Sequence, residues 1–176
     1  MPTIREQLAS LTVDVEYPDS GVSIHLSQSG GIRISIDRYE YENLTAHELE
    51  EAIEAGLTEA MDGYSEAVQS IRLSTFGEHQ HPPDGSRAAL QMKEYLEAES
   101  NIKIEAKSPR KFVTAQWWGR SDFIISIRRD ALDKLDAAAM ETEFNMLITA
   151  LTLVRTREVN RIQKSVYFSE KYTQRR

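Results

Sequence analysis

The sequence predicts an α+β protein built from two units of the order α-β-β-β-α, each a three-stranded antiparallel meander plus a long helix, packed as an intramolecular pseudo-dimer. Three observations support this fold class. When the chain is shifted by 91 positions, apolar residues fall on apolar residues for about sixty positions. In each half, three short stretches alternate apolar and polar residues, as strands with one buried face do. Each half then continues into a long segment with an apolar residue every three or four positions, which is typical of an amphipathic helix.

The repeat goes beyond hydrophobicity at several positions. Pro18 falls on Pro109, and the Ile-Ser-Ile triplet at 34–36 falls on the same triplet at 125–127. Two unrelated units of one architecture would also share such a pattern, because any hairpin followed by a helix alternates and then changes period. An unbroken register through three strands, two turns and a long helix favours duplication, or at least two structurally equivalent halves. A unit copied twice in one chain can pack as a pseudo-dimer.

The first unit, residues 1–76, opens with a short amphipathic stretch at 4–11 and continues into the first meander. Its turns are predicted at 18–21 and at Gly30 and Gly31. Thr45 followed by Glu48 forms a capping box that starts the long helix, which should end near Gly77. Gly56 and Gly63 lie within this helix; we expect them to be merely tolerated, the alternative being close approach of another backbone. The apolar strand positions are Leu11, Val13, Val15, Tyr17, Val22, Ile24, Leu26, Ile32, Ile34 and Ile36.

Residues 77–85 read as an exposed linker with two prolines and two histidines, and residues 86–166 form the second unit. Ser86 should cap a helix that reaches about residue 98 and packs through Ala89, Leu90, Met92 and Leu96. A second meander follows, with Trp117 on its core face. Asp136 should cap the last helix, which runs to about Ser165, and residues 167–176 form a polar tail. The sequence leaves open whether the halves pack sheet to sheet or through their long helices.

Composition excludes several classes of protein. The 176 residues are 40% hydrophobic and 28% charged, as in globular proteins, and include no cysteine, which rules out disulfides and thiolate metal sites. No signal-peptide core or membrane-spanning apolar run is present, so we expect a cytoplasmic protein without a membrane partner. The net charge of −7 hides an asymmetry. Residues 1–100 carry 6 basic and 19 acidic residues, a net charge of −13, and residues 101–176 carry 15 and 9, a net charge of +6.

Candidate catalytic and metal-binding residues are few. His79 and His81 alternate on the linker, but a stable site needs a third protein ligand, so we expect no metal and no cofactor. His25 and His47 are expected on the surface. The helix carboxylates should lie on a solvated polar face: Glu48, Glu50, Glu51, Glu54 and Glu59. No phosphate-binding glycine loop or nucleophile motif is present, and we expect no enzymatic activity.

Basic residues of the second unit are candidates for nucleic-acid binding. Spacings of four and three place Arg157, Arg161 and Lys164 on one stripe of the last helix, and Arg128 and Arg129 end the sixth strand. Such side chains neutralise phosphates without reading sequence. A solvated helix face, or a surface complementary to the acidic first unit, is the alternative. Because neighbouring strand residues point to opposite faces, Trp118 should be exposed, where it can anchor a partner.

The first unit resembles the YbaB/EbfC family of nucleoid-associated proteins, especially its actinobacterial members. The resemblance rests on residues 22–26 (VSIHL), residues 30–36 (GGIRISI), Leu44, Thr45 and residues 48–53 (ELEEAI). It covers roughly residues 4–75 and, more faintly, 86–166. Family members share the α-β-β-β-α order, form dimers and bind DNA with little sequence preference, and they are typically about half as long as this chain.

The resemblance implies a non-catalytic binding protein with double-stranded DNA as its partner. The strongly acidic first half favours an alternative, a protein-binding adaptor or chaperone associated with actinobacterial type VII secretion, where related segments occur. Either function is compatible with a homodimer of the pseudo-dimeric chain.

Overall fold

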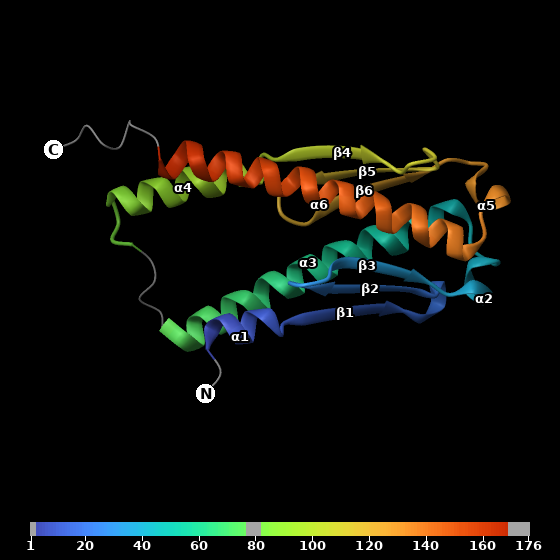
Figure 1. Cartoon of the computed structure of the whole chain (residues 1–176), viewed down its shortest axis with the longest axis horizontal. Coiled ribbons are helices and arrows are strands. Elements are labelled where there is room, and N and C mark those ends of the chain that lie inside the picture. The colour runs from blue at the N-terminus through green and yellow to red at the C-terminus, as the bar shows by residue number, and fades with distance from the viewer. Residues whose placement is uncertain (1–2, 77–81, 169–176) are drawn as a thin grey trace.

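The computed structural model of the chain describes residues 3–76 and 82–168 and shows the predicted α+β architecture (Figure 1). The first unit consists of α1 (Ile4–Ala9), β1 (Thr12–Tyr17), a 3-10 turn η1 (Pro18–Ser20), β2 (Val22–Ser27), β3 (Gly31–Ile36), α2 (Arg38–Tyr41) and α3 (Ala46–Phe76). The second consists of α4 (Arg87–Ser100), β4 (Lys103–Lys107), β5 (Val113–Trp118), β6 (Asp122–Ile127), α5 (Ala131–Lys134) and α6 (Ala137–Tyr167). The short elements η1, α2 and α5 are the ones not predicted from the sequence.

The two sheets have the same topology and register. Each is a three-stranded antiparallel meander, in the orders β1-β2-β3 and β4-β5-β6. Ile24 pairs with Ile34 in the first sheet, and their counterparts 91 positions later, Ala115 and Ile125, pair in the second. The repeat in the sequence is therefore a repeat of strand pairing, because register decides which residues share the buried face.

Side chains cap the helices where the sequence places the caps. Thr45 and Glu48 bond each other's backbone N–H at the start of α3, at 2.8 and 3.2 Å. The Asp136 carboxylate accepts the Ala139 N–H at 2.8 Å, and the Ser86 hydroxyl accepts the Ala89 N–H at 3.1 Å. These bonds satisfy backbone donors that have no partner within the first turn.

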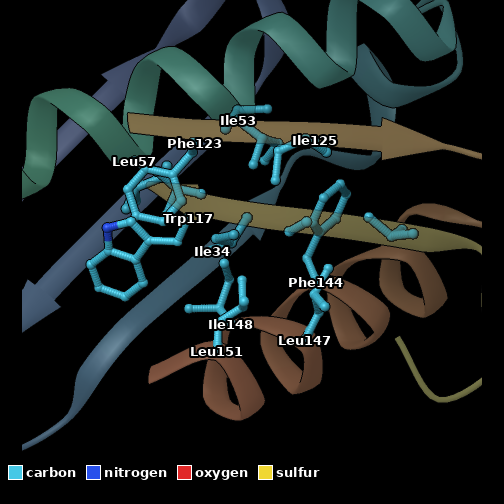
Figure 2. Packing of buried hydrophobic residues seen from close by; sticks show 14 of the residues in the cluster. Ile34, Ile53, Leu57, Trp117, Phe123, Ile125, Phe144, Leu147, Ile148 and Leu151 are labelled. Carbon is cyan, nitrogen blue, oxygen red and sulfur yellow. The ribbon is translucent and has the colours of Figure 1, made fainter. Parts of the chain in front are cut away.

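One continuous core joins the two units (Figure 2). Helix α3 packs on β1 and β2 of its own sheet and also on β6, while α6 packs on β4 and β5 and also on β3. Ile34 and Ile125, on the last strand of each sheet, are both buried in this core, as are Leu57 of α3 and Phe144 of α6. The Tyr41 hydroxyl donates to the Leu135 carbonyl at 2.9 Å, a further link between the units. The halves thus pack through their long helices, each on the other's last strand.

The two glycines of α3 differ in their surroundings. A Cβ at Gly56 would lie 2.6 Å from Cδ1 of Ile24 and 3.2 Å from Cε2 of Tyr17, which is too close for packed carbon atoms. Gly63 has room, since its Cβ would meet only Val13 at 3.5 Å. The expectation of two tolerated glycines is wrong for Gly56, where the neighbour is a strand side chain and not another backbone.

Candidate functional site

Carboxylates of α3 hold the open edge of the second sheet. Glu50 and Glu54, four residues apart, each accept a backbone N–H of β6, from Ile127 and Ile125 respectively, both at 2.6 Å. These N–H groups belong to the strand's unpaired edge, which would otherwise be free to pair with another chain. The expected solvated role is wrong for these two glutamates, because they are partly buried acceptors between the units.

Helix α6 holds the edge of the first sheet in the same way. Asn145 accepts the Ile34 N–H at 2.9 Å and returns a bond to the Ile34 carbonyl at 2.7 Å. Glu141 accepts the Ile36 N–H at 3.0 Å. All four side chains and all four strand residues are related by the 91-residue shift. Each long helix therefore substitutes for a fourth strand at the edge of the opposite sheet and fixes the angle between the units.

Beyond the sheets, the helices diverge into two arms. One arm is α1 with the C-terminal half of α3, and the other is α4 with the C-terminal half of α6 (Figure 1). A groove with a volume of about 910 Å³ lies between them. Its apolar lining comes from both arms: Met61, Tyr64 and Val68 of α3, Met92 and Leu96 of α4, and Tyr167 of α6.

The groove also contains a charged cluster. The Arg155 guanidinium lies 4.4 Å from the centre of the Trp117 ring and 3.7 Å from the Glu99 carboxylate. Arg120, more exposed, contacts the same carboxylate at 3.4 Å. Burial lowers the pKa of Arg155, and the facing Glu99 opposes that shift. Two guanidinium groups around one carboxylate leave the cluster with an excess positive charge, carried chiefly by the exposed Arg120.

Helix α4 packs through a different face from the one expected from its apolar residues. Leu90, Met92 and Leu96 are 47%, 42% and 40% exposed, whereas Gln91 is buried and donates to the Val166 carbonyl at 3.2 Å. Two of them, Met92 and Leu96, line the groove, and large apolar residues on the side of α4 that α6 does not cover are the sequence signal for it. The spacing of apolar residues along α4 does not reveal which face the neighbouring helix covers.

The basic residues predicted to bind nucleic acid do not form one surface. Arg128 is ion-paired with Asp130 and stacks 4.1 Å from the centre of the Phe112 ring, and Arg129 is exposed nearby in sequence. Arg157 lies about 30 Å along α6 from the start of that helix, given a rise of 1.5 Å per residue. The structure therefore separates the strand-end pair from the helix stripe.

Within the helix stripe, the charges are unequally available. Arg161 is ion-paired with Glu158 at 2.9 Å. Arg157 and Lys164 are exposed, and neither has an acidic partner among residues 3–76 and 82–168. Two cations of the stripe thus remain unneutralised by the described part of the chain.

The tandem tryptophans lie as predicted on opposite faces of β5. Trp117 is 3% exposed and packs on Phe123, whereas Trp118 is 40% exposed. The Trp118 ring lies 3.9 Å below the Lys103 ammonium group, and its indole N–H donates to Gln116 at 3.2 Å. Its role as an anchor for a partner stays a prediction.

The histidines provide no assembled metal site in the part of the chain that the structure describes. His25 bonds the Asp14 carboxylate at 2.6 Å on the outer face of the first sheet, and His47 is exposed near Glu51. No group of three or more potential ligands converges among the described residues. His79 and His81 lie outside them. No helix within 3–76 or 82–168 combines the length and apolar character needed to cross a bilayer.

Comparisons with protein-family models, curated proteins and solved structures gave no match for this chain.

Proposed function

We propose that this protein is a non-catalytic adaptor or chaperone that holds an apolar segment of a partner protein in the groove between its two helical arms. The observation that carries the proposal is the apolar groove itself, into which Met92 and Leu96 project while 42% and 40% exposed. Monomeric proteins rarely leave adjoining large apolar side chains in a concave surface without a ligand.

The charges in the groove indicate the chemistry of the partner. The groove lining carries three acidic and three basic side chains, Asp62, Glu66 and Glu99 against Arg72, Arg120 and Arg155, so its charges balance overall. Arg120, which shares Glu99 with Arg155, is more than half exposed and can meet a further carboxylate. An amphipathic helix that lays apolar residues against the two arms and offers a carboxylate to Arg120 would satisfy both features. Binding of this kind needs no chemical step from the protein.

A matched pair of variants tests this function. Leu96→Glu places a charge in the groove, and Leu90→Glu places the same charge on the same helix outside it. Each variant is used as bait in a lysate of the source organism, and the amount of partner protein recovered per bait is measured. We expect Leu96→Glu to recover at least about tenfold less partner than wild type, because binding would bury an unpaired charge. Leu90→Glu should retain it. A wild-type bait without a stoichiometric partner, or equal retention by both variants, would contradict the proposal.

DNA association is the second candidate function. It is favoured by the exposed, unpaired Arg157 and Lys164 and by the resemblance to the YbaB/EbfC family, whose dimer this chain would reproduce within one polypeptide. Retention of duplex DNA should weaken steeply between about 50 and 200 mM salt. Arg157→Glu with Lys164→Glu should abolish it, whereas the Arg161→Glu control, at a neutralised position, should reduce it less. An absence of retention at low salt would eliminate this candidate.

A further inference from the structure

The outward face of α6 carries no exposed charge over four helical turns. Between Thr142 and Thr156, all of which the structure describes, the only charged residues are Glu143 and Arg155, and both are buried. Met146 and Leu153, seven residues apart and therefore on one face, are each 53% exposed. We call the face formed by Thr142, Met146, Thr149, Leu153 and Thr156 the outer stripe. A charge-free face of this length on a surface helix indicates a contact.

The threonine hydroxyls of the outer stripe already have hydrogen-bond acceptors within the helix. The hydroxyls of Thr142, Thr149 and Thr156 donate to the carbonyl oxygens four residues earlier, at 2.9, 2.7 and 2.8 Å. Each hydroxyl hydrogen therefore has an acceptor within the helix. Covering these side chains would leave no donor unsatisfied, so the usual cost of burying a hydroxyl is avoided.

The equivalent face of α3 is different. The 91-residue shift places Ala55 at the position of Met146 and Asp62 at that of Leu153. Glu51, at the position of Thr142, is also exposed. The two helices have the same length and the same task at the opposite sheet edge, so the uncharged stripe is a property of α6 alone and is not required by the fold.

We propose that the outer stripe is the interface with a second copy of this chain, formed by two α6 helices packed antiparallel about Thr149. The charges at the two ends of α6 favour a second copy as the partner and an antiparallel orientation of the two helices. Asp133 and Asp136 lie at the N-terminal end, where Lys134 is already paired with Asp130, and Arg157 and Lys164 lie at the C-terminal end, where Arg161 is already paired with Glu158. A helix with acidic and basic ends is complementary to its own antiparallel copy.

The distances along the helix agree with this pairing. Asp136 precedes Thr149 by 13 residues and Lys164 follows it by 15, which correspond to about 20 and 22 Å at 1.5 Å per residue. An antiparallel pair centred on Thr149 therefore brings each basic end beside the acidic end of the other copy. A parallel pair would bring like charges together. The acidic face of α3 in another copy offers no large apolar residue for Met146 and Leu153.

The interface leaves the groove accessible. The residues of α6 that line the groove are Arg155, Gln163 and Tyr167, and none of them belongs to the outer stripe. Self-association and capture of a partner segment are therefore separate properties, and the Leu96→Glu variant should dimerise as wild type does.

Analytical ultracentrifugation of the full chain from about 1 µM to 1 mM tests the proposal, since this range covers the affinities of transient interfaces. We expect the mass to rise from 20.1 kDa toward twice that value. Met146→Glu with Leu153→Glu should weaken association by about tenfold or more, and higher salt should weaken it in wild type. Ala55→Glu, the matched change on α3, should have no effect. A wild-type chain that stays monomeric throughout would overturn the proposal.

Disulfide crosslinking tests the orientation, because the chain contains no cysteine of its own. Thr149→Cys should form a covalent dimer on oxidation, since residue 149 lies next to its own copy at the two-fold axis. Lys164→Cys should not, because the two copies of residue 164 lie about 45 Å apart in the antiparallel pair. Crosslinking of Lys164→Cys would overturn the antiparallel arrangement, and a monomeric oxidised Thr149→Cys would overturn the interface. Circular dichroism verifies that each variant is folded.

Discussion

Removing the carboxylates of α3 that accept hydrogen bonds from β6 should lower the free energy of unfolding by weakening the contact between the two units. In Glu50→Ala with Glu54→Ala, the N–H groups of Ile125 and Ile127 lose acceptors at 2.6 Å. A hydrogen bond to a charged group contributes about 1.5 to 3 kcal/mol, and water can replace part of it at a partly buried edge. We therefore expect the double variant to lose about 3 kcal/mol of unfolding free energy, or about 6 to 12 °C in Tm.

Urea unfolding and amide hydrogen exchange together measure this effect. The free energy of unfolding should fall while the m-value changes little, because the core surface buried on folding is the same. Exchange of the Ile125 and Ile127 amides should accelerate more than that of their hydrogen-bonded neighbours in the sheet. Glu54→Gln retains an acceptor of similar length and should lose only about 1 kcal/mol.

Glu51→Ala is the control on the same helix, since this glutamate is exposed and is paired with the exposed His47 at 3.3 Å. It should alter stability by no more than about 0.5 kcal/mol. A double variant at Glu50 and Glu54 that matches this control would refute the assigned role of the two carboxylates. Aggregation of the double variant would instead agree with an uncovered strand edge.

Two further predictions follow from packing and charge. Gly56→Ala should destabilise the protein by about 1 to 2 kcal/mol, because overpacking against Ile24 outweighs the gain in helix propensity, whereas Gly63→Ala should stabilise it by about 0.5 to 1 kcal/mol in the same thermal unfolding assay; equal effects would contradict the packing difference. Burial would raise the pKa of Glu143, but hydrogen bonds from Arg110 outweigh it and the pKa lies below its ordinary value of 4.5. The stabilisation is present above 4.5 and is lost as the pH falls through the lower folded-state value. Unfolding measured against pH should show a shallower acid slope for Glu143→Gln, and an unchanged slope would exclude this pair as a contributor.

The fold was predictable because the strand and helix periods are visible along the chain. Alternation over residues 22–26 and 32–36 identifies strands of one buried face, and Thr45 and Asp136 identify the helix starts through capping. The four-residue helices α2 and α5 are too short to show a period. Their caps differ as well, since Asp37 bonds backbone N–H groups of α2 while Asp130 makes no capping bond.

The contacts between the units were not predictable from one sequence. Glu54 has the pattern of a solvated helix residue, and only the position of β6 makes it an acceptor for Ile125. Leu96 has the pattern of a packing residue, but the helix that covers α4 reaches its other face. Periodicity predicts which residues share a face and not what lies opposite that face. The groove and the contacts at the sheet edges both depend on which element lies opposite a helix face.

Two equivalent units in one chain can present different surfaces, whereas the two halves of a symmetric dimer must present the same surface twice. The edge-capping positions have the same task in both halves, where Glu54 and Asn145 accept equivalent strand N–H groups through a carboxylate and an amide oxygen. The solvent faces differ, since Asp62 and Leu153 occupy equivalent positions with opposite preferences for water. The contacts between the units therefore require similar residues at equivalent positions of both units, whereas the exposed faces can differ and contact different partners. The uncharged outer stripe of α6 and the acidic face of α3 give the molecule two distinct sides, a difference that the proposed adaptor, with one self-association surface and one groove, would use.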